Sequence, residues 1–493
     1  MTDILFTHSY FLHFDPKELR ALMPYPPLGT ITAAAFLRKQ GFTVGLHDVM
    51  LSEGESEFIP ALDTHAPRMV VIYDDSFNYL TKMCLSRMRQ AALQLARYSK
   101  EKNCIVVVFS SDAADHVEEY LANNVDYVLT GEGEETLAEL SSMLLRTSGA
   151  NPLEIKGLAF RDSDGVIVRT ARRPPIKDLD GIPFPAWDLV NIERYRSAWK
   201  ERHGYFSLNI STTRGCPFHC NWCAKPLYGQ VYNSRSPENV VAEMKFLKAD
   251  IRPDHLWITD DIFGLKPGWI ARFAEIVQKE KTAIPFKCLS RVDLLVRDDT
   301  VLHLKNAGCR TVWVGAESGS QKVLDAMEKG TTVEEIGLAT KMLREAGIRV
   351  GFFLQFGYPG ESAEDIAKTV AMVRQHEPDE IGISVSYPLP GTKFYDRVKA
   401  QLGAKQNWET SDDFDPMVQA AFSREYYHAL HAVVHKRFRI WRGLRTLRDI
   451  SARPRSINRR ALEILASMMV HGITLPRHLR MLRELEQAPR ANA

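Results

Sequence analysis

A short stretch near the middle of the chain carries the residues with the clearest chemistry. Cys216, Cys220 and Cys223 stand in the spacing C-x3-C-x2-C. Intervals of four and three residues let one tight loop bring three thiolates to a single iron-sulfur cube. Three ligands leave one of its irons open. An open metal position can bind and activate a small molecule, as the vacant position on catalytic zinc does.

The alternative for these cysteines is a structural zinc knuckle or an accidental group of buried thiols. A closed tetrahedral zinc site requires a fourth cysteine or a well-spaced histidine. His219 is the one candidate nearby, and it lies inside the loop itself. We therefore expect a 4Fe-4S cluster held by the three cysteines.

The cysteine loop, with Trp222 directly before its third cysteine, resembles the signature of the radical S-adenosylmethionine (SAM) enzymes. The resemblance implies that the open iron chelates the amino and carboxylate groups of SAM. One electron from the cluster then cleaves SAM to methionine and a 5'-deoxyadenosyl radical. An electron donor such as flavodoxin or ferredoxin is implied as a partner.

Repeated strands and helices must position this loop. Apolar runs alternate with helical patterns over residues 206–400, where six β/α units fit, including strands near 207–210, 256–258, 286–289, 311–314, 350–354 and 381–385. Six parallel units predict a partial (β/α)6 barrel resembling a TIM barrel, with its chemistry at the carboxyl ends of the strands.

Polar residues follow several of these strands. An anionic pair at Asp260 and Asp261 suits the methionine ammonium of SAM, and Arg291 suits its carboxylate through a two-pronged contact. The segment Gly315-Ala316-Glu317-Ser318-Gly319 matches the usual Gly-x-Glu-Ser-Gly of the family. The resemblance implies these SAM-binding residues: Trp222, Asp260, Asp261, Arg291, Glu317, Ser318 and Gln355.

The first 150 residues have a similar alternation. Short apolar runs at 4–6, 44–46, 70–73, 105–109 and 127–129 are separated by helical stretches such as 29–40 and 80–99. Continuous apolar strands between helices indicate a parallel sheet covered on both faces. Ligands of such sheets lie beyond the carboxyl ends of the strands.

The loops at those ends resemble the cobalamin-binding domain that precedes the radical SAM domain in one large subfamily. They include Pro-Pro-Leu-Gly at 26–29 and Gly-Glu-Gly-Glu at 131–134. The resemblance implies a Rossmann-like fold and these cobalamin-binding residues: Leu28, Gly29, Asp75, Ser76, Ser110, Ser111, Gly131 and Glu132.

Two departures from that subfamily bear on cobalamin. The cobalt-ligating pattern D-x-H-x-x-G is missing, so His8, His13 and His47 are expected to be ordinary loop or strand-end residues and cobalt to lack a histidine ligand. Ser110-Ser111 stands where Gly-Gly is usual. The alternative is a Rossmann-like domain that has lost its ligand and only packs on the catalytic domain.

Four regions result: a cobalamin-binding domain (1–150), a proline-rich connector strap (151–205), the radical SAM barrel (206–400) and a basic helical region (401–493). Residues 431–493 carry 14 Lys and Arg against 4 Asp and Glu, although the whole chain has a net charge of +2. We expect a helix over 423–450, with Val434, Phe438, Trp441, Leu444 and Leu447 on one face, and a second over 459–470. Capping of a neighbouring domain is favoured over contact with an anionic membrane surface, and nucleic acid is not expected.

The composition, with 45% hydrophobic and 25% charged residues, is that of an ordinary globular protein. Seven scattered or clustered cysteines form no disulfide framework, which favours a reducing compartment. The start of the sequence has no signal-peptide pattern, and no run of 18 apolar residues occurs. We expect a cytoplasmic location.

The resemblance implies a cobalamin-dependent radical SAM enzyme that methylates an unactivated carbon of a small-molecule or lipid substrate. It would use methylcobalamin together with a 5'-deoxyadenosyl radical. One alternative is an oxidative cyclase or rearrangement enzyme without net methyl transfer, since the anaerobic cyclase of bacteriochlorophyll synthesis has the same domain order. The other is a non-catalytic cobalamin carrier or sensor.

Overall fold

The computed structural model describes residues 2–77, 85–146, 151–223, 227–402, 407–411, 417–418, 420–452 and 457–487. The chain forms two compact units. The first unit comprises 1–218, 225–289 and 407–413, and the second comprises 219–224, 290–406 and 414–493.

The first unit begins with a doubly wound sheet whose strand order is β2-β1-β3-β4-β5-β6-β7. Strands β1 to β5 are parallel, and β6 and β7 are antiparallel additions at one edge. The strands are β1 (Ile4–Thr7), β2 (Val44–Leu46), β3 (Met69–Tyr73), β4 (Ile105–Phe109), β5 (Tyr127–Leu129), β6 (Leu158–Arg161) and β7 (Ile167–Arg169).

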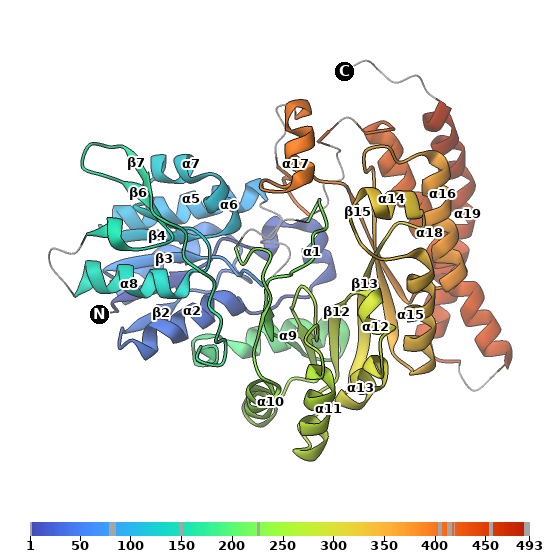
Figure 1. Ribbon diagram of the computed structural model, residues 1–493, viewed down its shortest axis with the longest axis horizontal. Coiled ribbons are helices and arrows are strands. Elements are labelled where there is room, and N and C mark those ends of the chain that lie inside the picture. Colours follow the sequence, from blue (N-terminus) through green and yellow to red (C-terminus); the bar gives the residue numbers. More distant parts are fainter. Residues whose placement is uncertain are drawn as a thin grey trace. The chain divides into compact units, whose positions relative to one another are not determined.

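Helices cover both faces of this sheet, with α2 and α8 on one side and α5, α6 and α7 on the other (Figure 1). Their bounds are α1 (Pro16–Ala21), α2 (Leu28–Lys39), α3 (Phe58–His65), α5 (Ser86–Glu101), α6 (Ser111–Asp115), α7 (Val117–Ala122) and α8 (Glu134–Leu145). The central strands are buried on both faces, as in β3 and β4, which explains their unbroken Val and Ile runs. The five predicted strands are confirmed, and of the helix predicted over 80–99, residues 80–84 lie outside the described part.

Three regular elements in the region 151–205 were not predicted. Strands β6 and β7 extend the first sheet beyond residue 150, and α9 (Ile192–His203) precedes the next sheet. The proline-rich strap between them contains the single 3-10 turn Trp187–Leu189. It contacts α2, where Ala186 N donates to Ile31 O at 3.0 Å, and the start of α10 (Pro237–Phe246), where Ser236 N donates to Asp180 at 2.8 Å.

The rest of the first unit provides three parallel strands, β8 (Ser207–Ile210), β11 (His255–Ile258) and β12 (Phe286–Ser290), paired in the order β8-β11-β12. Helix α10 continues into a π-helical turn (Leu247–Ile251), and α11 (Trp269–Lys279) follows β11. The cysteine loop begins in a small antiparallel ribbon of β9 (Thr213–Arg214) and β10 (Asn233–Ser234).

The second unit provides the other three parallel strands, β13 (Cys309–Glu317), β14 (Arg349–Phe356) and β15 (Glu380–Val385), in that order. The helices between and after them are α12 (Val292–Leu295), α13 (Thr300–Ala307), α14 (Gln321–Ala326), α15 (Val333–Glu345), α16 (Ala363–His376) and α17 (Lys393–Val398). Capping boxes at Thr332 and Ser362 fix where α15 and α16 begin. The α/β class and all six predicted strands are confirmed.

Two long helices, α18 (Arg424–Ala452) and α19 (Arg459–Gln487), lie beside α16 (Figure 1). Gly443 lets them approach closely, since a Cβ there would lie 2.5 Å from Met468. Helix α19 continues past the predicted end at residue 470, and Pro476 lies within it. Along the predicted apolar face of α18, Val434 and Phe438 are buried, whereas Leu444 and Leu447 are 53% and 41% exposed.

Within the described ranges, no helix has the length and apolar character needed to cross a lipid bilayer.

Candidate active site

The cysteine loop is anchored in the first unit by Asp260, which directly follows Thr259 at the end of β11. The Asp260 carboxylate accepts hydrogen bonds from the backbone of Thr212 at 2.7 Å and of Thr213 at 3.0 Å, and from the Thr212 hydroxyl. Burial raises the pKa of Asp260 to about 6, although these hydrogen bonds oppose the shift. Asp260 therefore holds the start of the loop, whereas its predicted neighbour in the site, Asp261, is exposed.

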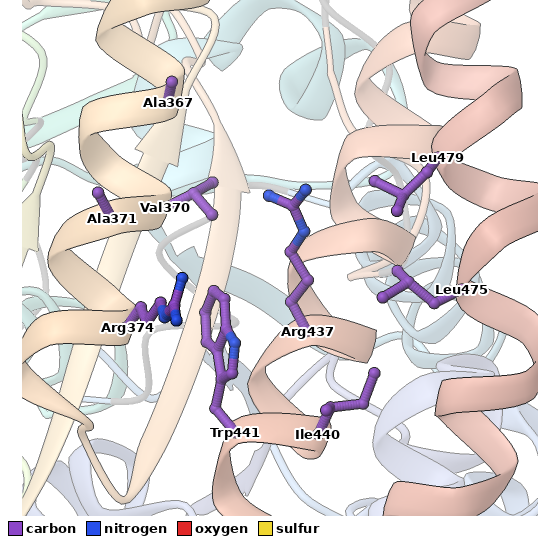
Figure 2. A pocket seen from close by; sticks show the side chains of 9 residues that line it. All are labelled: Ala367, Val370, Ala371, Arg374, Arg437, Ile440, Trp441, Leu475 and Leu479. Carbon is purple, nitrogen blue, oxygen red and sulfur yellow. The ribbon is translucent and has the colours of Figure 1, made fainter.

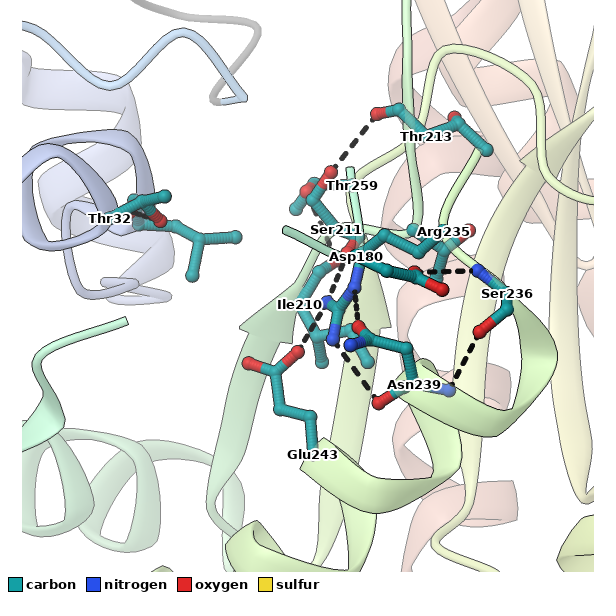
Figure 3. A network of polar contacts seen from close by, with 12 residues as sticks. Thr32, Asp180, Ile210, Ser211, Thr213, Arg235, Ser236, Asn239, Glu243 and Thr259 are labelled. Carbon is teal, nitrogen blue, oxygen red and sulfur yellow. Dashed lines mark hydrogen bonds and ion pairs between the residues drawn. The ribbon is translucent and has the colours of Figure 1, made fainter. Parts of the chain in front are cut away.

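Arg235 anchors the returning strand of the same loop (Figure 3). Its guanidinium donates to Ser211 O at 2.9 Å and to Asn239 Oδ1 at 2.7 Å, and it pairs with Glu243 on α10. Its backbone N–H donates to Thr212 O at 2.9 Å. The base of the loop is thereby fixed to a helix on one side and a strand on the other.

Gly215, directly before the first cysteine, has a backbone conformation that only glycine adopts easily. Its φ is +80°, and a Cβ there would lie 2.3 Å from Val231 O. The loop must pass this close to the segment after it for Cys216, which is buried, to reach its position.

Arg214 connects the cysteine loop to the first sheet within the first unit. Its guanidinium forms a two-pronged contact with Glu134 at 2.6 and 3.2 Å and lies 3.6 Å from Glu132. All three side chains are buried. Close by, the Tyr228 hydroxyl lies 2.5 Å from Ser76 Oγ. Two loops at the carboxyl edge of the first sheet therefore contact the segments on either side of Cys216.

The carboxyl edge of the first sheet has its topological switch point between β1 and β3, where ligands of doubly wound sheets bind. Asp75 accepts from Gly29 N at 2.9 Å and from Phe77 N at 3.0 Å, and Leu28 is buried beside them at the start of α2. Burial raises the pKa of Asp75. Leu28, Gly29, Asp75 and Ser76, four of the residues predicted to bind cobalamin, therefore lie together at this edge.

The other predicted cobalamin residues lie after β4 and β5. Ser110 caps α6 by accepting from Ala113 N at 2.9 Å, and Ser111 is the buried first residue of that helix. Gly131 has a φ of +85°. Glu132 accepts from Ile176 N, and its burial raises its pKa to about 7. A hollow of about 40 Å³ at this edge is lined by Leu28, Phe77 and Arg214 among others.

His8, at the end of β1, belongs to a buried network. Its Nε2 lies 2.9 Å from Asp48 Oδ1, and Tyr195 donates to the other oxygen of Asp48 at 2.6 Å. These bonds hold the pKa of Asp48 below its usual value, although burial opposes them. The histidine therefore has a structural partner, as expected for an ordinary strand-end residue.

Lys329 is the centre of the polar cluster in the second unit. Its ammonium lies 2.8 Å from Glu317 Oε1 and 5.8 Å from the centre of the Trp222 ring, and its carbonyl accepts from Arg291 at 3.0 Å. The Glu317 carboxylate and the Cys220 sulfur both raise the pKa of Lys329, although burial opposes the shift. Arg291 also donates to Asp293 at 2.9 Å, and its Nη1 lies 3.8 Å from Cys220 Sγ.

Two cations therefore lie beside a predicted cluster ligand in the second unit. Cysteine ligates metals as the thiolate, and these two cations place positive charge where that thiolate would lie. Glu317 has a φ of +55°, unusual for a residue other than glycine. Such local strain is common where a binding site dictates the conformation.

Asn221 fixes the loop segment between the second and third cysteines. Its backbone N–H donates to Met327 O at 3.0 Å, its side chain donates to Ala326 O at 2.8 Å, and the Tyr358 hydroxyl donates to its Oδ1 at 2.9 Å. Trp222 packs against the apolar cluster that contains Val323, Met327, Tyr358 and Phe394.

Buried polar atoms without a partner are candidate contacts for a ligand in the second unit. Three buried atoms have no hydrogen bond among the described residues: Trp222 Nε1, Gln355 Oε1 and Glu361 Oε1. The side-chain nitrogen of Gln355, Nε2, donates to Ser386 Oγ at 3.0 Å. Ser318, by contrast, is fully buried and bonded to Thr369 at 3.1 Å, so it supports the turn after β13.

Cys216 belongs to the first unit, and Cys220 and Cys223 belong to the second. In the described ranges, no three His, Cys, Asp or Glu side chains are gathered closely enough to hold a metal ion. The fit of the site to a cluster rests on the chemistry of its donors, three cysteines on one anchored loop with Arg291 and Lys329 beside the second.

Sequence reasoning missed Lys329, Arg214 and Arg235. Arg214 and Arg235 flank the cysteine loop directly, so charged residues next to the motif were a usable signal. Lys329 follows α14 without a recognisable pattern, and only the fold brings it to Glu317.

Comparison with known proteins gives this site a family. Residues 210–373 match the radical SAM superfamily. The chain is 26% identical over 401 residues to an uncharacterized methyltransferase of Pyrococcus horikoshii, covering 80% of this chain and 83% of that protein. It is 28% identical over 297 residues to the anaerobic magnesium-protoporphyrin IX monomethyl ester cyclase of Rubrivivax gelatinosus, covering 58% of this chain and 52% of that protein.

Its fold is similar to that of TsrM, a radical SAM methyltransferase from Kitasatospora setae solved with cobalamin and a [4Fe-4S] cluster bound. The TM-score is 0.66 at 20% identity, over 81% of this chain and 75% of that one. Residues 210–373 therefore form a radical SAM domain, and the chain is a radical SAM enzyme.

Proposed function

We propose that the protein is a cobalamin-dependent radical SAM enzyme that methylates an unactivated carbon. The superfamily match over 210–373 and the similarity to a named methyltransferase support this. When bound, the cluster and SAM supply a radical that removes a hydrogen atom from the substrate, and cobalamin supplies the methyl group.

The observation that carries the proposal is the contact between the cysteine loop and the carboxyl edge of the first sheet. Arg214, two residues before Cys216, pairs with Glu134 after β5, and Tyr228 meets Ser76 after β3. A ligand at that edge is therefore near the loop that holds the cluster. Proximity of this kind replaces diffusion of a short-lived radical.

The chain's own residues have separate tasks in this proposal. Cys216, Cys220 and Cys223 hold the cluster, while Lys329 and Arg291 keep positive charge beside Cys220. Trp222 Nε1 is a donor and Gln355 Oε1 an acceptor for the polar groups of SAM, because both are buried without partners among the described residues. Asp260 positions the loop.

Cobalamin binding is proposed for the switch point of the first sheet. Asp75 and Ser76 bond to Gly29 and Tyr228, and their remaining hydrogen-bonding capacity is proposed to serve the cofactor. Ser110, Ser111, Gly131 and Glu132 are proposed to contact its nucleotide tail. The retained polarity of this edge supports a bound ligand over a domain that only packs.

The test is anaerobic reconstitution with iron, sulfide and cobalamin, followed by reduction with titanium(III) citrate in the presence of SAM. We expect 5'-deoxyadenosine and bound cobalamin, both measured by liquid chromatography and mass spectrometry. Cys220→Ala should abolish 5'-deoxyadenosine, and Cys104→Ala, at a buried cysteine directly before β4, should not. Wild-type protein that binds cobalamin but never cleaves SAM would instead be a carrier or sensor.

A radical cyclase or rearrangement enzyme is the second candidate, and the cyclase relative favours it. SAM with a deuterated methyl group distinguishes the two. A methyltransferase places the label in the product, whereas a cyclase consumes SAM and leaves the product unlabelled.

We also propose that the enzyme works in the cytoplasm on a small-molecule or lipid substrate, with flavodoxin or ferredoxin as its electron donor. Exposed apolar residues of α19, including Met469, Val470 and Ile473, together with the arginines of this region, support contact with a membrane surface. Sedimentation with vesicles that contain or lack an anionic lipid tests that contact.

A further inference from the structure

A cavity of about 410 Å³ lies between α16, α18 and α19 in the second unit (Figure 2). Pockets that bind small organic ligands measure about 300 to 1,000 Å³, so the size suits such a ligand. Only helix residues line it, and none of the strand-end residues of the candidate active site takes part.

The lining combines an apolar wall with two guanidinium groups. Val370, Trp441, Leu475 and Leu479 supply apolar surface. Arg374 of α16 and Arg437 of α18 line the same cavity, on either side of the Trp441 ring in the view of Figure 2. The lining contains no acidic side chain. Cations on an apolar wall fit a ligand that has both an anionic and an apolar part.

Within the part of the chain that the structure describes, the two arginines of the cavity are not neutralised by a carboxylate. In the described ranges, neither Arg374 nor Arg437 has an ion pair or hydrogen bond. Two arginines further along α18 differ, since Arg445 lies 2.9 Å from Asp379 and Arg448 lies 3.0 Å from Glu377.

The charged groups around Arg437 add to this imbalance. Burial, followed by the positive charges of Arg483 and Arg374, holds the pKa of Arg437 below its usual value. An anion in the cavity would relieve this repulsion, and guanidinium groups bind carboxylates and phosphates in a two-pronged geometry.

We propose that this cavity binds a single-chain amphiphilic anion, with its carboxylate or phosphate head between Arg374 and Arg437 and its hydrocarbon chain against Trp441, Leu475 and Leu479. Burial of the chain adds affinity with each methylene group. The proposal does not depend on the radical chemistry, because the two sites share no residue.

Titration calorimetry of the full chain tests the proposal with three probes: dodecanoate and dodecyl phosphate below their micelle concentrations, and dodecanol below its solubility limit. We expect both anions to bind at least tenfold more tightly than dodecanol. The double variant R374Q/R437Q should weaken the anions at least tenfold and leave dodecanol unchanged. Ala371→Phe, which fills the cavity from an exposed lining position, should weaken all three.

Arg480→Gln is the matched control, because Arg480 is an exposed arginine of α19 outside the cavity. Its anion affinity should equal that of the wild type. The proposal is overturned if the probes do not bind, if head-group charge makes no difference, or if R480Q is as harmful as the double variant. Equal affinity for inorganic phosphate would leave no role for the apolar wall and would also overturn it.

The source of the anion is separated by a vesicle experiment. Phosphatidylcholine vesicles with and without phosphatidylglycerol are mixed with wild-type and Ala371→Phe protein. If the wild type binds free dodecanoate and A371F does not, the result supports binding in the cavity. Binding only to phosphatidylglycerol vesicles, unaffected by A371F, would assign the charge to a membrane-facing surface and contradict the proposal.

Discussion

Replacing Arg214 with Gln should destabilise the first unit strongly. Arg214 and Glu134 are 5% and 3% exposed and joined at 2.6 Å, and Glu132 lies within 3.6 Å of the same guanidinium. Removing one partner of a buried ion pair leaves an uncompensated charge and costs about 3 to 5 kcal/mol. We expect the free energy of unfolding of R214Q to fall by that amount.

The matched control is Arg38→Gln. Arg38 also meets a carboxylate at 2.9 Å in the first unit, but it and Asp188 are 42% and 65% exposed. Exposed pairs contribute about 0 to 1 kcal/mol. Both variants remove one positive charge, so the difference between their losses in the free energy of unfolding reports the effect of burial.

The assay is urea unfolding of the reduced, cofactor-free protein, followed by tryptophan fluorescence at pH 8. The double variant R214Q/E134Q should be more stable than the sum of the single changes indicates, with a coupling of about 0.5 to 3 kcal/mol. A cost below about 1 kcal/mol for R214Q, or strict additivity with E134Q, would refute the buried contact between the cysteine loop and the first sheet.

Three further changes have clear expected results. Burial raises the pKa of Glu132 to about 7, above its unfolded value. Its favourable contribution to the free energy of unfolding is therefore present below about pH 4.5 and is lost as the pH rises through 7. Glu132→Gln should flatten the pH dependence of the free energy of unfolding across this window, and an unchanged slope would contradict the burial of this side chain. Gly215→Ala puts a Cβ 2.3 Å from Val231 O and should lower iron loading several-fold. Gly54→Ala is the control: a Cβ at position 54 has no atom within 4 Å, so this variant should load iron normally. Lys329→Met leaves Glu317 buried without its partner and should lower the free energy of unfolding in urea by about 3 to 5 kcal/mol. Adding Glu317→Gln should recover part of that loss. No recovery would mean that the two side chains are not coupled.

Much of the fold could be predicted from the sequence because its strands are short unbroken apolar runs between amphipathic helices. Val70-Val71-Ile72 and Val106-Val107-Val108 have no other good environment than a sheet covered on both faces. β6 and β7 escaped prediction because both are short, β7 is a partly exposed edge strand, and the pairing of β6 depends on β5. The end of α19 was missed because Pro476 suggests a break, yet a neighbouring helix stabilises the turns after it.

The candidate site was predictable where chemistry fixes residue type and spacing, as in the cysteine loop and the polar residues after β3, β11, β13 and β14. The role of each residue was less predictable, because it depends on which neighbour the fold supplies. Asp260 accepts a hydrogen bond from the backbone of the loop, and the Ser318 hydroxyl is hydrogen-bonded to that of Thr369. Lys329 joins the site only through the turn after α14.

The central claim is that the three cysteines of the loop hold one four-iron cluster. The most direct measurement is iron and sulfide content after anaerobic reconstitution, with absorbance near 400 nm and electron paramagnetic resonance of the reduced protein. We expect about four irons and four sulfides per chain, lost when Cys216, Cys220 or Cys223 is changed to Ala and kept in Cys309→Ala. A cluster that survives loss of these thiols, or wild-type protein that takes up no iron, would contradict the claim.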